Sequence, residues 1–215
     1  MKIDFVSDVS CPWCVIGLKA LEQAIAKLPE QAIELEFQPF ELNPAMVPEG
    51  QEINEHLAQK YGASDAQLAA TREAIRQRGA ALGFTFTEGA RGRIYNTFDA
   101  HRLLHWAYEQ SPAQQRLLKT ALFDAYFTQG LDPSNHALLL SAAESVGLDA
   151  AAAQAVLQSD AYTAEVRAAQ QFYREQGINA VPAVIINGRH LIQGGQPVEV
   201  FEQALRQIIE ADEAK

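Results

Sequence analysis

The sequence has 215 residues, and both of its cysteines lie in one tetrapeptide, Cys11-Pro12-Trp13-Cys14. A chain of this length buries a core without covalent cross-links, which excludes a small disulfide scaffold and a zinc module with four cysteine ligands. With 17 Lys and Arg against 27 Asp and Glu, the net charge of −10 argues against a protein that binds nucleic acid or an anionic membrane surface.

The sequence around the first residues carries no signal for export. An acidic residue, Asp4, stands where a signal peptide needs an apolar segment, and no apolar run is long enough to span a bilayer. We therefore expect a cytoplasmic protein. Thiols are kept reduced in that compartment, so the two cysteines are not expected to form a static structural disulfide.

The first part of the chain has a β-α-β pattern. Residues 3–7 are predicted to form a short buried strand, followed by a loop in which Ser10 is a candidate helix cap and Pro12 suits the first helical turn. Apolar residues then recur at helical spacing until Pro29, and residues 33–37 alternate as in a strand. Two strands joined by a helix favour parallel pairing with a right-handed crossover.

The middle of the chain, from about residue 51 to residue 176, has a largely helical pattern. Ser64 begins a capping box, and Asn96 is the candidate cap of a helix over residues 96–110. Another helix is predicted to start after Ser111-Pro112. This stretch is therefore predicted to be an all-helical insertion.

The last part of the chain returns to strands. Two apolar runs, 183–186 and 189–192, flank Asn187-Gly188, a pair that tolerates the positive φ values of a tight hairpin turn. A closing helix is predicted over residues 198–209. The predicted order is thus β-α-β, a helical block, then β-β-α.

The cysteine pair is predicted to be redox-active. A Cys-x-x-Cys motif beside a β-α-β unit is typical of thioredoxin-like redox proteins. Cys11 would lie at the helix N-terminus, where unpaired N–H groups and the helix dipole stabilise a thiolate. Cys14 would lie one turn later, where its sulfur can reach Cys11. Cys11 would therefore attack a substrate disulfide, and Cys14 would resolve the mixed disulfide.

Two other interpretations of the cysteines stay open. The pair could bind zinc together with His101 and His105, which are spaced to share one helix face. Alternatively, Cys11 and Cys14 could be inert buried thiols. A Pro-Trp insert at a helix start suits redox chemistry better than a metal knuckle, so we expect no metal.

Val181-Pro182 directly precedes the predicted hairpin. A single proline here would ordinarily be a trans residue that starts a strand. In thioredoxin-like folds, however, a cis proline faces the Cys-x-x-Cys motif. We therefore expect a cis bond that exposes the backbone of Val181 to an extended peptide or to glutathione.

Four separated motifs give the chain its resemblance to a known family: Asp8 to Cys14, Asn96 to Leu103, Phe123 to Phe127, and Val181-Pro182 followed by Gly194 to Pro197. In this order they resemble the DsbA-like thioredoxin family, and most of all its cytoplasmic FrnE-type branch. The resemblance implies an α/β thioredoxin fold with a large helical insertion. It also implies dithiol–disulfide oxidoreductase activity, with Cys11 as nucleophile, Cys14 as resolving thiol and Pro182 as the cis proline.

The resemblance also divides the chain. Residues 1–45 and 178–215 would form a discontinuous thioredoxin-like domain, and residues 46–177 the helical insertion domain. No bound cofactor is implied beyond the redox-active Cys11–Cys14 disulfide, with glutathione as a candidate reducing partner or co-substrate. Protein or small-molecule thiols and disulfides would be the substrates.

Two alternative functions accompany the first. The chain could be a glutathione-dependent isomerase or transferase, similar to 2-hydroxychromene-2-carboxylate isomerases and kappa-class transferases. Those relatives typically carry Ser where this chain has Cys11, and lack its second cysteine. The chain could also be a stress-linked, chaperone-like module that binds unfolded proteins in an apolar groove.

Other candidate substrate-binding residues surround the cysteines. Pro12 and Trp13 lie inside the motif, where Trp13 could contact substrate or only pack the motif against the helical block. His101 could assist proton transfer and Arg102 could hold an acidic group of the substrate. A purely structural role for this segment, with Asn96 as a helix cap, is the alternative.

Overall fold

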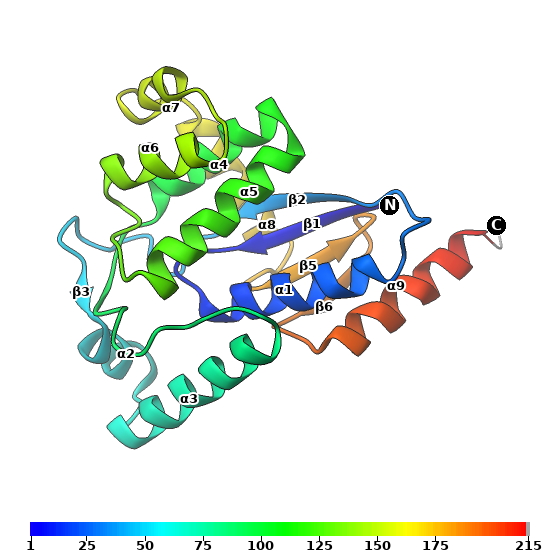
Figure 1. The fold of residues 1–215 in the computed structure, drawn as a ribbon, viewed down its shortest axis with the longest axis horizontal. Helices are drawn as coiled ribbons and strands as arrows, with labels where there is room; N and C mark the ends of the chain where they lie inside the picture. Colours follow the sequence, from blue (N-terminus) through cyan, green and yellow to red (C-terminus); the bar gives the residue numbers. More distant parts are fainter. Residues whose placement is uncertain (214–215) are drawn as a thin grey trace.

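The computed structural model describes residues 1–213 and contains a mixed sheet surrounded by helices (Figure 1). The sheet consists of β1 (Lys2–Ser7), β2 (Glu34–Pro39), β5 (Ala183–Ile186) and β6 (His190–Gln193), in the order β2-β1-β5-β6. β1 pairs parallel with β2 and antiparallel with β5, which forms a hairpin with β6. The predicted order of strands and helices is confirmed.

The helices surround this sheet. α1 (Pro12–Ala26) joins β1 to β2, and α9 (Val198–Glu213) follows the hairpin and packs against α1. Between β2 and β5 lie α2 (Ile53–Tyr61), α3 (Asp65–Ala81), α4 (Phe98–Gln110), α5 (Pro112–Phe123), a π-helical turn η1 (Asp124–Thr128), α6 (His136–Ser145), α7 (Ala150–Leu157) and α8 (Thr163–Glu175). This region also holds a small antiparallel pair, β3 (Gln51–Glu52) and β4 (Arg93–Ile94), too short for its sequence pattern to predict.

Alternating side chains on β1 separate the two faces of the sheet. Ile3 and Phe5 are completely buried in the core that α1 and α9 complete. Val6 points to the opposite face, where it packs with Tyr173 of α8. Figure 1 shows α8 behind the sheet and α1 in front of it. Because both faces of the sheet are covered, apolar residues of β1 are buried on each face, Ile3 and Phe5 on one and Val6 on the other.

The helical region is divided between two sides of the sheet and its helices α1 and α9. Helices α4 to α7 gather above the sheet in Figure 1 around an apolar core of their own, while α3 packs against α1 on the other side. Phe123 and Phe127, from the end of α5 and from η1, belong to the same core as the sheet. The helical region and the sheet therefore share part of their apolar core.

Local sequence signals explain most element boundaries. Ser64 forms the predicted capping box, and Ser111 caps α5. Asn187 and Gly188 both have positive φ, as the hairpin turn requires. The prediction of a helix start at Asn96 was wrong by two residues, because Thr97 takes the N-cap position. Among the described residues, no helix is long and apolar enough to cross a membrane.

Candidate functional site

Cys11 occupies the N-cap position of α1. Its backbone N–H donates to the carbonyl of Asp8 (3.2 Å), and its own carbonyl accepts from the N–H of Cys14 (3.1 Å). Ser10 was predicted as the cap, but the loop is one residue longer and the Ser10 hydroxyl has no hydrogen-bond partner. Pro12 begins the helix, and no side chain caps its first turn. Within the described residues, no side-chain acceptor therefore occupies this end of the helix beside the Cys11 sulfur.

Val181 and Pro182 face this helix start from a distant part of the chain. Their peptide bond is cis, as expected from the sequence. The Sγ atom of Cys11 donates to the carbonyl oxygen of Val181 over 3.7 Å. The structure thus brings Cys11 and the Val181-Pro182 loop together.

Two glycines allow that close approach. A Cβ atom on Gly17 would lie 2.9 Å from Cγ of Pro182, and one on Gly195 would lie 3.0 Å from the carbonyl oxygen of Trp13. Both distances are shorter than ordinary van der Waals contacts. Gly17 of α1 and Gly195 after β6 therefore set how tightly the proline loop packs on the cysteine motif.

Cys14 lies one helical turn after Cys11 and is completely buried, whereas Cys11 is 4% exposed. Both cysteines are free thiols in this structure. Burial raises the pKa of the Cys14 thiol well above its ordinary value, and the interaction with Cys11 raises it further. The two thiols therefore have unequal environments: one at the helix start and one held protonated in the core.

Asp8 is a buried carboxylate next to this motif. Its Oδ2 accepts from the N–H of Leu42 (2.7 Å), and its Oδ1 accepts from the N–H of Ser10 (3.2 Å). Nε2 of His101 lies 3.5 Å from the same Oδ1. Burial acts to raise the pKa of Asp8, but the neighbouring His101 and the N–H of Leu42 outweigh it and lower the pKa to about 2.

His101 therefore lies beneath the cysteine loop. The side chain is only 2% exposed and points to Asp8. Its contacts support the loop that carries Cys11, and its burial places it away from the surface where a substrate would bind.

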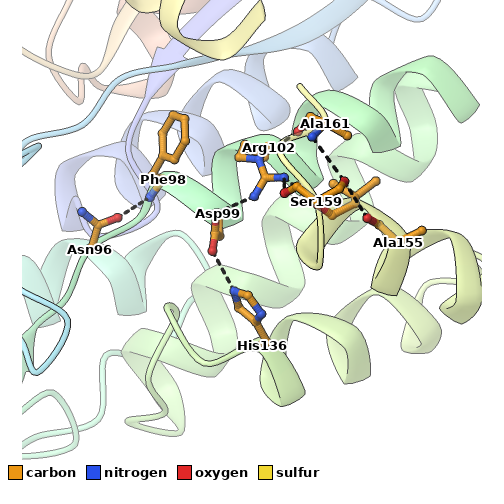
Figure 2. Close-up of polar contacts among 9 residues, drawn as sticks. Asn96, Phe98, Asp99, Arg102, His136, Ala155, Ser159 and Ala161 are labelled. Atoms are coloured by element: carbon orange, nitrogen blue, oxygen red, sulfur yellow. Dashed lines mark hydrogen bonds and ion pairs between the residues drawn. The ribbon is translucent and has the colours of Figure 1, made fainter. Parts of the chain in front are cut away.

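Arg102 does not occupy the position that its predicted substrate-binding role requires. Its guanidinium is buried and donates to the carbonyls of Val156, Ser159 and Ala161 and to the carboxylate of Asp99 (Figure 2). These acceptors belong to α7, to the turn that follows it and to α4 itself. Because its donors already have partners, Arg102 holds the helical region together instead of a substrate carboxylate.

His105 lies apart from the cysteines. Its ring packs on Tyr162, with ring centroids 5.3 Å apart. Within residues 1–213, no cluster of three or more His, Cys, Asp or Glu side chains is arranged to hold a metal ion.

Trp13 joins the cysteine motif to α3. The ring is partly buried against the main core, and the guanidinium of Arg78 stacks over it at 5.2 Å from the ring centre. Arg78 also donates to the carbonyl of Gly195 (2.8 Å). Trp13 therefore packs the motif against the helical block, as one of its two predicted roles requires.

A cavity of about 450 Å³ opens beside the motif, with Pro12 in its wall. Its lining carries both charges: three arginines, Arg72, Arg76 and Arg91, and three glutamates, Glu52, Glu73 and Glu88. Arg91 donates to the carbonyl of Ser10 (3.3 Å) and stacks over the ring of Phe127 at 5.1 Å. Burial lowers the pKa of this guanidinium. The cavity thus combines apolar walls with charged groups of both signs, next to the cysteine motif at Pro12.

One buried cation was not identified from the sequence. Lys119 of α5 has no exposed surface, and its Nζ atom has no hydrogen-bond partner in the part of the chain that the structure describes. Burial lowers the pKa of Lys119 to about 8, while Cys14, Asp8 and Cys11 act in the opposite direction. The sequence could have revealed this burial, because Lys119 lies on the helix face that also carries Leu118, Leu122 and Phe123.

Comparison with known proteins identifies a family and a fold. The model of the DSBA-like thioredoxin domain matches residues 2–206. The uncharacterized protein YwbO of Bacillus subtilis is 29% identical over 206 residues, covering 95% of this chain and 96% of that protein.

Solved structures give the same result. The probable DsbA oxidoreductase SCO1869 of Streptomyces coelicolor is 33% identical, with a TM-score of 0.89 over 96% of this chain and 89% of its own. The cytosolic disulfide reductase DsbM of Pseudomonas aeruginosa, solved with GSH, is 14% identical, with a TM-score of 0.68 over 98% of this chain and all of its own. At that identity, the second similarity concerns the fold alone.

Proposed function

Because the chain belongs to the DSBA-like thioredoxin domain family, we propose that it is a dithiol–disulfide oxidoreductase in which Cys11 attacks and Cys14 resolves. The observation that supports this assignment is the unequal placement of the two thiols. Cys11 stands at an uncapped helix start against the Val181 carbonyl, and Cys14 is completely buried one turn later. An attacking thiolate needs the first environment, and a thiol that reacts only within the protein tolerates the second.

The reaction proceeds in two exchanges. The Cys11 thiolate forms a bond with one sulfur of the substrate disulfide, and the other substrate sulfur leaves as a thiolate that takes up a proton. Cys14 then attacks Sγ of Cys11, the mixed disulfide breaks, and the second substrate thiolate takes up the proton that Cys14 loses. Two electrons pass from the cysteine pair to the substrate, and the pair ends as a disulfide. The reverse sequence oxidises a substrate dithiol.

The substrate is proposed to bind between the proline loop and the arginine-lined cavity. Next to the cis bond to Pro182, the backbone of Val181 is proposed to pair with an extended peptide or with glutathione. Pro12 forms part of the cavity wall, and Arg91 supplies a cation for an acidic group. We propose protein or small-molecule disulfides as substrates, glutathione as a partner, the cytoplasm as the compartment, and no cofactor besides the cysteine pair.

An insulin-reduction assay tests this function. The wild type is expected to precipitate the insulin chains in the presence of a thiol reductant, and Cys11→Ser is expected to fall to the uncatalysed rate. Equal rates for the two proteins would disprove the proposal. If Cys14→Ser kept full turnover of an aromatic glutathione substrate, the isomerase or transferase alternative would replace it. Holdase activity that survives loss of both cysteines would support the chaperone-like alternative.

A further inference from the structure

Lys119 carries a charge in a position where a protein ordinarily avoids one. Its side chain is completely buried, and Nζ lies 5.1 Å from the ring centre of Phe123 and 6.0 Å from that of Phe37. Among residues 1–213, no acceptor lies within hydrogen-bonding distance of Nζ. A buried ammonium without a hydrogen-bonded partner destabilises the folded protein, because burial removes its hydration.

The position of Lys119 is fixed by its neighbours. One turn earlier on α5, the Gln115 side chain accepts from the N–H of Phe37 (2.9 Å) and donates to its carbonyl (3.0 Å). This pair of hydrogen bonds attaches α5 to β2, and directs Lys119 toward the core that contains Phe37, Cys11 and Cys14. The ammonium is thus held toward the cysteine pair.

The titratable groups around Lys119 are the two reacting cysteines and the buried pair beneath their loop. They are Cys14 and Cys11 at the start of α1, and Asp8 in the loop before them, with His101 of α4 next to Asp8. Burial has the largest effect on the pKa of Lys119 and lowers it, and among the neighbouring groups Cys14 acts most strongly in the opposite direction; Lys119 in return acts to lower the pKa of Cys14. Asp8 already receives three polar contacts of its own.

We propose that the Lys119 ammonium assists the resolving step by stabilising the charge that develops on Cys14. This inference rests on the proposed function. In the mixed disulfide, Cys14 must lose its proton before it can attack Sγ of Cys11, and burial opposes that loss. A fixed positive charge in the same dry environment offsets part of the penalty. Lys119 acts through Cys14 and takes no part in bond making.

The test separates the two exchanges. Reduced protein is mixed with oxidised glutathione, quenched with acid at intervals, and analysed by intact mass spectrometry. The wild type is expected to show little mixed disulfide, because Cys14 resolves it quickly. In Lys119→Met we expect the adduct to accumulate and to decay about tenfold more slowly near pH 7, since the loss of thiolate exceeds the gain in nucleophilicity. The decay should also become more steeply dependent on pH.

Matched controls identify the cause. Arg116→Met removes one positive charge from the same helix, but from a side chain that is 54% exposed and pairs with Glu22, and its decay should equal that of the wild type. Lys119→Met should be at least as stable as the wild type in urea, because it replaces a buried charge with an apolar chain. Decay at the wild-type rate in Lys119→Met would overturn the inference, as would equal slowing in Arg116→Met.

A second measurement needs no substitution. The Lys119 amine, followed by the NMR signals of its Cε protons, should deprotonate at higher pH in the reduced protein than in the oxidised one, because only the reduced pair can carry thiolate charge. Identical titrations in the two states would overturn the inference. The Cys14→Ser variant separates failure of this inference from failure of the proposed function. If that variant forms no glutathione adduct, both the proposed function and this inference are wrong.

Discussion

The starts of α1 and α4 carry two of the sequence motifs that looked functional, and they use their helix ends in opposite ways. At α1 no side chain caps the first turn, and Cys11 stands at the open end. At α4 the Asn96 side chain accepts from the N–H of Phe98 (2.9 Å), and Asp99 in the first turn pairs with Arg102 and His136 (Figure 2). A helix end that already has its partners stabilises the fold, and an open one is available to an anion.

The largest expected stability effect belongs to the α4 side of this comparison. Arg102→Met would remove the guanidinium that donates to the carbonyls of Val156, Ser159 and Ala161. We expect the free energy of unfolding to fall by about 3 kcal/mol, because buried acceptors lose their hydrogen bonds. Urea denaturation measures this loss. The folded protein should keep the insulin-reducing activity of the wild type, and a selective loss of activity would restore Arg102 to the substrate site.

Asp8, in the loop before α1, and His101 of α4 connect the two helix starts. Their expected contribution to the free energy of unfolding is smaller than that of Arg102. The folded pKa of Asp8, about 2, lies below its ordinary value of 3.8. Its ionised form therefore stabilises the fold by on the order of 2 kcal/mol above about pH 4, and this contribution is lost as the pH falls toward 2. Asp8→Asn should remove it. Urea titrations across this range check the slope, and an unchanged slope in the variant would contradict the assignment.

The smallest expected changes in stability come from substituting the polar residue beside each helix start. Asn96→Ala should cost about 1 kcal/mol, because Phe98 loses the acceptor of its N–H. Ser10→Ala should change stability by less than about 0.5 kcal/mol, since the Ser10 hydroxyl has no partner to lose. Equal costs in thermal denaturation would show that α1 is capped after all and that its open end is not a distinguishing feature.

Local chemistry made the fold and the cysteine site predictable. The strand alternation, the Ser64 capping box and the Asn187-Gly188 turn each depend on neighbouring residues, and each was found where expected. Val181-Pro182 could be placed opposite Cys11 only because the order of the elements implied the topology. These features share short-range or topological causes.

Other features of the site depend on contacts between distant segments. Nothing local shows that Gly17 and Gly195 must lack side chains, because their neighbours come from the proline loop and from the cysteine motif. Arg102 resembled a substrate-binding residue because its acceptors are backbone carbonyls, which every sequence contains. In the sequence, Lys119 could be seen only as a cation on an apolar helix face. Tertiary packing determines the role of each.

Trapping the mixed disulfide tests the central claim, that two thiols one turn apart have unequal roles. Reduced Cys14→Ser and Cys11→Ser are each treated with oxidised glutathione, and the adducts are located by mass spectrometry of the peptides. We predict a stable adduct on Cys11 in the first variant, and none on Cys14 in the second over the same time, because that thiol is buried and protonated. An adduct on Cys14 at a comparable rate, or none on Cys11, would contradict the account.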